Sequence, residues 1–389
     1  MIVIVEAVRT AMGGFQGSLS SYTAPDLGAA AIKEVVARSG LQPNEIDEVI
    51  MGCVLPAGLK QGPARQGMRQ AGLPDSTGAT TINKICGSGM KAVIQAADAI
   101  KAGSAEIVVA GGMESMSNAP YLMDKARAGF RMGHGKVTDH MFQEGLEDAE
   151  TGLSMGILAQ DMADKKGYTR EQQDQYAIAS LNKAVAAIEG GFFKDEIVPV
   201  VVSSRKGQVT VDQDEQPLNA KVDKIPSLRP AFKKDGTITA ANASSISDGA
   251  SALLVTSSEI AAERGLTPLA NIVAYASHSQ HPSEFTIAPV GAIEKVLKQT
   301  GWNAKEVDLW EINEAFAMVT MAAIDAFDLD TAKVNINGGA CALGHPLGSS
   351  GSRIIVTLIH ALKRTGGKKG IAALCIGGGE ATAIAVELV

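Results

Sequence analysis

Four side chains that could act together in catalysis lie in turn-forming stretches of the sequence: Cys86, Asn313, His345 and Cys375. A cysteine becomes a strong nucleophile once its thiol has lost a proton, and a nearby histidine can accept that proton. A second thiol can serve as a further acid or base, and asparagine adds a polar group. These residue types indicate nucleophilic catalysis by a cysteine, provided that the fold brings them together.

Cys86 lies between two predicted elements. A β-type run at 79–82 precedes it, and the apolar spacing over residues 90–97 predicts a helix after it. At the start of a helix, unpaired backbone N–H groups and the helix dipole favour a thiolate. Gly87 and Gly89 would let another molecule approach the sulfur closely. The alternative is a buried cysteine that acts as a small apolar side chain, the commoner role of a lone cysteine.

The other three residues lie downstream at similar turns. His345 is in the glycine-rich loop 337–346, Cys375 ends a buried strand before three glycines, and Asn313 lies between a strand and a helix. A lone histidine is more often a structural hydrogen-bonding group than a catalyst. Four such groups at the ends of core strands favour a site.

Strands and helices alternate along the first 118 residues. Apolar periodicity and glycine positions predict strands 2–8, 48–54, 79–82 and 106–110 and helices 25–39, 62–71 and 90–103. This alternation indicates βαβ units and a mostly parallel sheet.

The sequence also contains an internal repeat. Residues 32–47 align without a gap with residues 293–308. The identical pairs include Gly40 and Gly301, Glu45 and Glu306, and Asp47 and Asp308. Further on, Gly89 and its helix fall opposite Gly351 and a second helix. Two copies of one α/β unit would place the starts of these helices near each other, so we predict a site at the junction of the halves.

Residues 119–247 do not continue the alternation of strands and helices seen in the halves. They are predicted to be an insertion with helices at 155–165 and 170–189. Within it, residues 205–234 hold seven Lys or Arg, including Arg205 and Lys206, against four Asp or Glu. Scattered charges of this kind usually form a solvated surface, and the alternative is an anchor for a polyanionic ligand.

Composition excludes several classes of protein. The net charge of −7 argues against nucleic acid as the main partner, and the four irregularly spaced cysteines fit neither a disulfide framework nor a metal site. No apolar run reaches the roughly 20 residues that span a bilayer, and no targeting segment is apparent. We therefore expect a cytoplasmic protein.

These stretches resemble the thiolase family (acyl-CoA C-acyltransferases) closely and in order along the whole chain. The matching segments are 83–90, 313–317, 338–351 and 375–379, with 3–15 as the opening strand and loop. The resemblance implies a five-layered αβαβα fold of two similar halves. Residues 1–118 and 248–270 would form the N-terminal half, 119–247 a loop domain over the CoA, and 271–389 the C-terminal half. Within the family the chain is most similar to the short-chain acetyl-CoA acetyltransferases, which are usually homotetramers (dimers of dimers) tied by a loop at 121–141.

The resemblance also implies roles. Cys86 would carry the acyl group, His345 would take its proton, and Cys375 would exchange the α-proton of acetyl-CoA. Asn313, through a water, would stabilise one oxyanion together with His345, and the backbone N–H groups of Cys86 and Gly377 the other. The partners would be acetyl-CoA, acetoacetyl-CoA and CoA, with no metal or redox cofactor. A thiol suits the second role because its ordinary pKa, about 8.5, lies near the working pH once modestly lowered.

For CoA, the resemblance implies a track along the pantetheine and adenine lined by Leu146, Met155, Ala231, Phe232, Ala240, Ser244, Ala315 and Phe316. Short-chain relatives often carry a basic residue for the nucleotide phosphates in the region that reads 216–221 here, where Lys221 is the candidate substitute. Phe285 stands where many biosynthetic relatives have Met, and it resembles enzymes that accept 2-methyl-branched substrates. Cys53 and Cys341 are expected to pack in the interior.

Three alternatives remain open from the sequence. One is a broader-chain 3-ketoacyl-CoA thiolase, and another is a β-ketoacyl synthase, which shares the fold but carries a second His or Asn where Cys375 lies. The third is a non-catalytic acyl-CoA carrier, against which the presence of all four candidate residues argues.

Overall fold

Nine strands form the main path of one large sheet in the computed structural model, which describes residues 1–204 and 207–389. The order is β13-β14-β15-β12-β1-β11-β5-β3-β4. The bounds are β1 Ile2–Thr10, β3 Glu48–Gly52, β4 Gly78–Ile82, β5 Ile107–Ser115, β11 Ser247–Ser257, β12 Ala270–Ser279, β13 Leu309–Ile312, β14 Lys369–Ile376 and β15 Glu380–Leu388. β1 and β12 join the two half-sheets through two residue pairs, Val3 with Asn271 and Ile4 with Ala270.

The prediction of a mostly parallel sheet is wrong. β3 pairs in parallel with β4 and β5, and β13 with β14. In contrast, antiparallel pairing joins β1 to β11, β11 to β5, β12 to β15 and β14 to β15. The last pair is a hairpin closed by the tight turn 377–379, and the insertion returns the chain into the sheet as β11 in the opposite direction. The sheet is therefore mixed.

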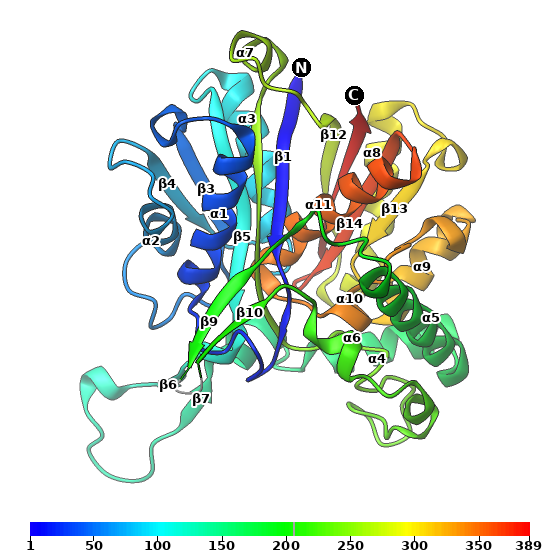
Figure 1. Ribbon diagram of the computed structural model, residues 1–389. Helices are drawn as coiled ribbons and strands as arrows, with labels where there is room; N and C mark the ends of the chain where they lie inside the picture. Colours follow the sequence, from blue (N-terminus) through cyan, green and yellow to red (C-terminus); the bar gives the residue numbers. More distant parts are fainter. Residues whose placement is uncertain (205–206) are drawn as a thin grey trace.

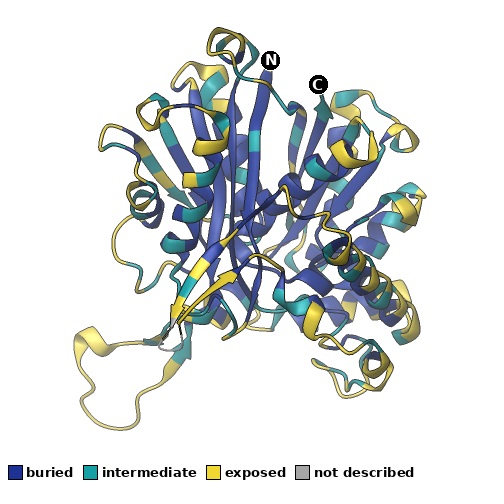
Figure 2. Ribbon diagram, viewed as in Figure 1, coloured by how far each residue is buried: buried dark blue, intermediate teal, exposed yellow. Residues whose placement is uncertain are grey.

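Helices divide the molecule into five layers (Figure 1). α1 (Ala24–Ser39) and α2 (Pro63–Gln70) cover the outer face of the N-terminal half-sheet, and α8 (Ala288–Thr300) covers the outer face of the other. α3 (Ser88–Ala102) and α11 (Leu347–Thr365) lie between the half-sheets, where their apolar residues form one buried core (Figure 2). The predicted αβαβα arrangement is confirmed.

The internal repeat is also confirmed. α1 and α8 end at Gly40 and Gly301, whose φ values of 78° and 72° are left-handed and favour glycine at a helix end. The next turn in each copy starts with a capping box closed by Glu45 or Glu306. The copies differ at one edge, because the counterpart of β4 is a single parallel bridge between Trp310 and Val334.

α3 and α11 approach each other at the two aligned glycines. A Cβ on Gly89 would lie 2.7 Å from the backbone N of Ser352, and a Cβ on Gly351 would lie 2.4 Å from the backbone N of Met90. Because side chains would separate the two helices, glycine at both positions lets their N-terminal turns meet. The starts of the two helices therefore lie together, as the repeat predicted.

Between β5 and β11 the chain forms an arm, two helices and a small hairpin. The arm comprises β6 (Tyr121–Met123) and β7 (Val137–Asp139) and projects from the body at the lower left of Figure 1. The helices are α4 (Met155–Lys166) and α5 (Arg170–Glu189), and the hairpin is β9 (Val200–Ser204) with β10 (Gly207–Val211). Shorter elements complete the chain: β2 Gly13–Gly14, β8 Ile197–Val198, α6 Glu215–Asn219, α7 Ser258–Glu263, α9 Ala317–Phe327 and α10 Ala340–Leu343. Across residues 1–204 and 207–389, no helix combines the length and apolar character needed to cross a membrane.

Candidate active site

Cys86 lies in the loop that enters α3, directly before Gly87, the residue that caps the helix. The Ser88 hydroxyl fixes this loop by donating to the carbonyl of Ile85 at 2.7 Å and accepting from the backbone N–H of Lys84 at 2.8 Å. A Cβ on Gly87 would lie 2.3 Å from Ile376 at the end of β14. Glycine therefore allows the Cys86 loop of one half to touch the strand that carries Cys375 in the other.

The environment of Cys86 favours a neutral thiol. Burial of the sulfur raises its pKa to about 11, and the backbone N–H groups of Gly377 and Cys86 offset this only in part, while the negative charge of Glu114 adds to it. The expectation of a stabilised thiolate at rest is therefore wrong, because the loss of hydration on burial raises the pKa more than the backbone N–H groups at the helix start lower it. A base must remove the proton when the thiol reacts.

His345 is a neutral base whose tautomer the structure fixes. The hydroxyl of Ser350 donates to the carbonyl of Pro346 at 2.9 Å, so its oxygen accepts the hydrogen bond of 2.5 Å from Nδ1 of His345. Nε2 then carries the free lone pair, and it is buried with no hydrogen-bond partner among the residues that the structure describes. Burial and the positive charge of Arg353 lower the pKa of His345 to about 3.

Cys375 and Asn313 end neighbouring strands of the C-terminal half. Cys375 lies near the end of β14, fully buried, and burial together with the charge of Cys86 raises its pKa well above the usual range. The predicted modest lowering is thus wrong for the same reason as at Cys86. Asn313 follows β13, accepts a hydrogen bond at Oδ1 from Arg353 at 3.4 Å, and leaves Nδ2 without a partner within residues 1–204 and 207–389.

One cavity of about 220 Å³ brings most of the predicted residues together. The predicted residues in its wall are Cys86, Leu146, Met155, Phe232, Ser244, Ala315, Phe316, His345, Cys375 and Gly377. Its other wall residues are Phe142, Gly145, Ser154, Gly156, Ala243, Ile246, Phe285 and Leu347. Apart from Phe285, these other residues were not predicted from the sequence, and most of them lie next to a predicted residue along the chain. The backbone bridge between Ala243 and Phe316 joins two wall segments that are distant in sequence.

Four predicted residues lie outside this wall: Lys221, Ala231, Ala240 and Asn313. Lys221, Ala231 and Ala240 are exposed on the insertion, whereas Asn313 is buried. Arg205 and Lys206 of the basic stretch lie outside the described residues. Lys233 of the same stretch forms an ion pair with Asp164 at 2.7 Å, so its charge is already paired within the protein.

Two buried charged groups near the site carried no signal in the sequence. Glu114, at the end of β5, accepts backbone hydrogen bonds from Val54, Leu55 and Gly348. Burial raises its pKa to about 7, against the effect of these donors. Arg353 on α11 faces Glu311 at 3.6 Å as well as Asn313. Glu114 therefore ties residues 54–55 to the start of α11, close to His345, and Arg353 ties α11 to the segment that carries Asn313.

Cys53 packs in the interior, as expected, whereas Cys341 is only partly covered. The Cys53 thiol contacts Glu114 at 3.7 Å, and burial raises its pKa. Cys341 is half-buried, and its thiol donates to the carbonyl of Glu314 at 3.6 Å. Neither residue contributes to the wall of the cavity described above.

Comparisons with known proteins agree over the whole chain. The family model described as "Thiolase, N-terminal domain" matches residues 2–259, and "Thiolase, C-terminal domain" matches residues 266–388. The chain is 51% identical over 385 residues to an acetyl-CoA acetyltransferase of Pseudomonas aeruginosa, covering 98% of both proteins. It is 50% identical over 387 residues to one of Escherichia coli, covering 99% of this chain and 98% of the relative.

Solved structures are equally similar. The crystal structure of an acetyl-CoA acetyltransferase of Bacillus anthracis matches with a TM-score of 0.97 at 42% identity, covering 100% of this chain and 98% of that one. A thiolase of Ascaris suum in complex with coenzyme A matches with a TM-score of 0.94 at 44% identity over the full length of both chains.

Proposed function

We propose, from the premise that the chain belongs to the thiolase family of acyltransferases, that it is an acetyl-CoA acetyltransferase. It would interconvert acetoacetyl-CoA plus CoA and two molecules of acetyl-CoA through an acyl group on Cys86. The observation that carries the proposal is the single cavity shared by Cys86, His345 and Cys375. Two thiols beside one neutral imidazole fit acyl transfer in two steps.

In the first step of synthesis, Nε2 of His345 takes the proton of the Cys86 thiol, and the sulfur attacks the thioester carbon. A Cys86 sulfur–carbon bond forms as the bond to the CoA sulfur breaks. Cys375, a neutral thiol at rest because burial raises its pKa, donates its proton to the departing CoA thiolate. The site then holds an acyl-Cys86, a Cys375 thiolate and a protonated His345, so charge and protons balance.

In the second step, the Cys375 thiolate removes the α-proton of the next acetyl-CoA, and the carbanion attacks the acyl carbon. Cys86 leaves as a thiolate and regains its proton from His345. We assign one oxyanion to the backbone N–H groups of Cys86 and Gly377, which already face the Cys86 sulfur. We assign the other to His345 and, through a water, to the unpartnered Nδ2 of Asn313.

For CoA, we propose that the wall residues Leu146, Met155, Phe232, Ser244, Ala315 and Phe316 contact pantetheine. Exposed Ala231 and Ala240 would lie further along the track towards the adenine, and Lys221 would meet a phosphate. The Ascaris thiolase in complex with coenzyme A, at 44% identity, supports a CoA site in this fold. We also retain the predicted division into 1–118 with 248–270, 119–247 and 271–389.

Phe285 bears on the substrate range. It is buried in the cavity wall and packs edge-on against Phe316 at 6.4 Å between ring centres. We propose some tolerance for 2-methylacetoacetyl-CoA. Side-by-side assays with acetoacetyl-CoA, the 2-methyl compound and a longer 3-ketoacyl-CoA test this, and zero turnover of the branched compound would refute it. Turnover of the longer compound would favour the broader-chain alternative.

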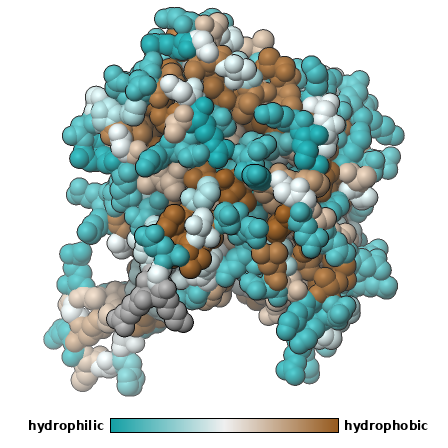
Figure 3. Space-filling view, viewed as in Figure 1, coloured by the Kyte–Doolittle hydropathy of each residue, from teal (hydrophilic) through white to brown (hydrophobic). Residues whose placement is uncertain are grey.

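We further propose a cytoplasmic homotetramer. The arm carries exposed apolar side chains, which are Tyr121, Met123, Phe130, Met132 and Val137. In the space-filling view, hydrophobic and hydrophilic groups lie side by side on it (Figure 3). Exposed apolar groups on a projecting hairpin favour contact with another subunit. Light scattering after gel filtration should give a tetramer, and removal of the arm should give a smaller particle.

CoA-dependent loss of acetoacetyl-CoA tests the function directly. The wild type should turn over, Cys86→Ser should neither turn over nor form an acyl-enzyme, and Cys375→Ala should be nearly inactive. CoA binding without wild-type turnover would favour the carrier. Turnover that survives Cys375→Ala would refute the role of Cys375, and decarboxylation of malonyl-CoA would favour the synthase.

A further inference from the structure

One wall of the cavity consists of an irregular segment whose position depends on side-chain contacts. Residues 228–246 connect a 3-10 turn at Val222–Ser227 to β11 through turns and one β-bridge. They contribute Phe232, Ala243, Ser244 and Ile246 to the wall. The end of the segment makes backbone hydrogen bonds to the C-terminal half, from the N–H of Ser244 to the carbonyl of Ala315 at 2.9 Å and from the N–H of His345 to the carbonyl of Ser245 at 3.1 Å. The rest of the segment belongs to no ladder of backbone hydrogen bonds, so side chains must help to fix it against the cavity.

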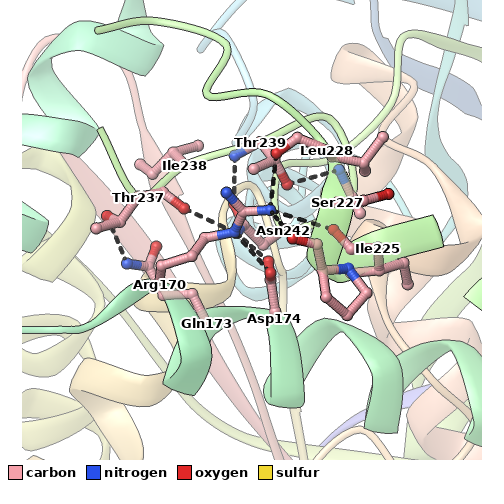
Figure 4. Close-up of polar contacts among 12 residues, drawn as sticks. Arg170, Gln173, Asp174, Ile225, Ser227, Leu228, Thr237, Ile238, Thr239 and Asn242 are labelled. Atoms are coloured by element: carbon pink, nitrogen blue, oxygen red, sulfur yellow. Dashed lines mark hydrogen bonds and ion pairs between the residues drawn. The ribbon is translucent and has the colours of Figure 1, made fainter. Parts of the chain in front are cut away.

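Arg170, the first residue of α5, holds the start of this segment (Figure 4). Its Nη2 donates to the carbonyls of Ile225, Pro226 and Leu228 at 3.2, 3.3 and 2.9 Å. Its Nε donates to Oδ2 of Asp174, one helical turn further on, at 2.6 Å. The planar guanidinium therefore joins α5 to three carbonyls at and just after the turn, which a lysine ammonium at the end of a flexible chain reproduces poorly.

The same carboxylate holds the end of the segment. Oδ1 of Asp174 accepts from Nδ2 of Asn242 at 2.9 Å, and this amide also donates to the carbonyl of Thr237 at 3.1 Å and accepts from the N–H of Thr239 at 2.8 Å (Figure 4). The carbonyl of Asn242 accepts from the N–H of Ala317 at 2.8 Å. Asn242 thus links the segment to the loop that carries Asn313, Ala315 and Phe316.

We propose that Arg170 is a positioning residue for the acyl-CoA site: through Asp174 and the carbonyls at 225–228, it fixes the 228–246 wall against the C-terminal half. This inference rests on the proposed function and deepens it. Arg170 is not in the cavity wall and leaves the reacting sulfur untouched. Loss of the Arg170 side chain should therefore weaken the binding of pantetheine and leave the acyl-transfer chemistry at Cys86 intact.

The test compares Arg170→Ala and Arg170→Lys with Arg38→Ala. Arg38 is a matched control, because it pairs with Glu34 one turn away at 2.8 Å, donates to a backbone carbonyl, and is exposed to a similar degree (28% against 26%) on α1. In thiolysis we expect Arg170→Ala to raise KM for CoA and acetoacetyl-CoA about tenfold, the effect of one charge-assisted hydrogen bond. Its kcat should stay close to that of the wild type, Arg170→Lys should be intermediate, and Arg38→Ala should resemble the wild type.

A truncated donor separates positioning from general damage. Acetoacetyl-N-acetylcysteamine lacks the nucleotide and most of pantetheine, so Arg170→Ala should form acyl-Cys86 from it at the wild-type rate and from acetoacetyl-CoA more slowly at subsaturating donor. An equal loss with both donors, or an unchanged KM for CoA, would overturn the proposal. If the wild type shows no turnover, the proposed function fails, and calorimetric titration of CoA into the same proteins still decides the role of Arg170. A wild type that binds no CoA would overturn both.

Discussion

The two halves of the molecule use one framework at equivalent positions. Oδ2 of Asp47 accepts the backbone N–H groups of Glu106 and Ile107 at 2.8 and 2.9 Å. Oδ2 of Asp308 accepts those of Lys368 and Lys369 at the same two distances. The aspartate before β3 thus ties this strand to its sheet neighbour β5, and the aspartate before β13 ties that strand to its sheet neighbour β14. The residues that build the layers have the same function in both copies.

The loops before the central helices differ in the residues that would take part in the reaction. When Gly89 is aligned with Gly351, Gly348 falls opposite Cys86, and Asn83 falls opposite His345. The N-terminal copy supplies the nucleophile and uses Asn83 to fix its own loop through the N–H of Ile85. The C-terminal copy supplies the base. The duplicated framework therefore positions two different loops, and the site exists because both meet at one cavity.

The largest effect should follow from removing the base of the C-terminal copy. His345→Asn places there the residue that the N-terminal copy has, and asparagine cannot accept the Cys86 proton. Since the pKa of Cys86 is about 11, few molecules carry a thiolate at neutral pH. We expect a loss in the rate of acyl-enzyme formation on the order of 10³-fold, measured by rapid quench and mass spectrometry.

Ser350→Ala is the matched partner of this variant. It keeps the imidazole and removes the group that holds its Nδ1, so the loss should be much smaller. A His345→Asn protein that acylates at more than a tenth of the wild-type rate would contradict the role of His345. Equal losses in both variants would show that the loop had lost its structure, and circular dichroism would reveal this.

A smaller effect distinguishes the two thiols. With its pKa at about 11, Cys86 should react with iodoacetamide faster as pH rises, by about tenfold per unit from pH 7 to 10, because the thiolate is the reactive form. Cys375, more deeply buried and with its pKa well above the usual range, should be alkylated later. Peptide mass spectrometry at each pH assigns the modified cysteine. A plateau near pH 8 would show that Cys86 is already a thiolate there.

Sequence reasoning located the reactive residues because each lies in a local pattern of strand, glycine turn and helix. The repeat at Gly40 and Gly301 also predicted that two such turns would meet. Strand direction could not be read in the same way. β11 lies antiparallel to β1 and β5 because a long insertion returns it to the sheet, and no local pattern records that path.

Charge states were equally beyond the sequence. Whether Cys86 and Cys375 are thiols or thiolates depends on burial by segments hundreds of residues away. Glu114 lies beyond the predicted strand 106–110, and Arg353 lies in the predicted helix after Gly351. The importance of both residues follows from contacts with Gly348 and Asn313. The Ser350 contact that fixes the His345 tautomer required the geometry of α11.

The smallest effect concerns the framework itself. Asp47→Ala and Asp308→Ala each remove one acceptor of two backbone hydrogen bonds, so each should lower the free energy of unfolding by about 1–2 kcal/mol, measured as a drop in thermal midpoint, with kcat unchanged. Burial opposes ionisation of Asp308, yet the N–H groups of Lys369 and Lys368 and the nearby lysines lower its pKa. Its stabilisation should therefore be complete above the unfolded pKa of about 3.9 and disappear as pH falls through the folded value. Unequal losses in the free energy of unfolding at pH 7, or a lower kcat in either variant, would contradict a shared structural role of the two aspartates.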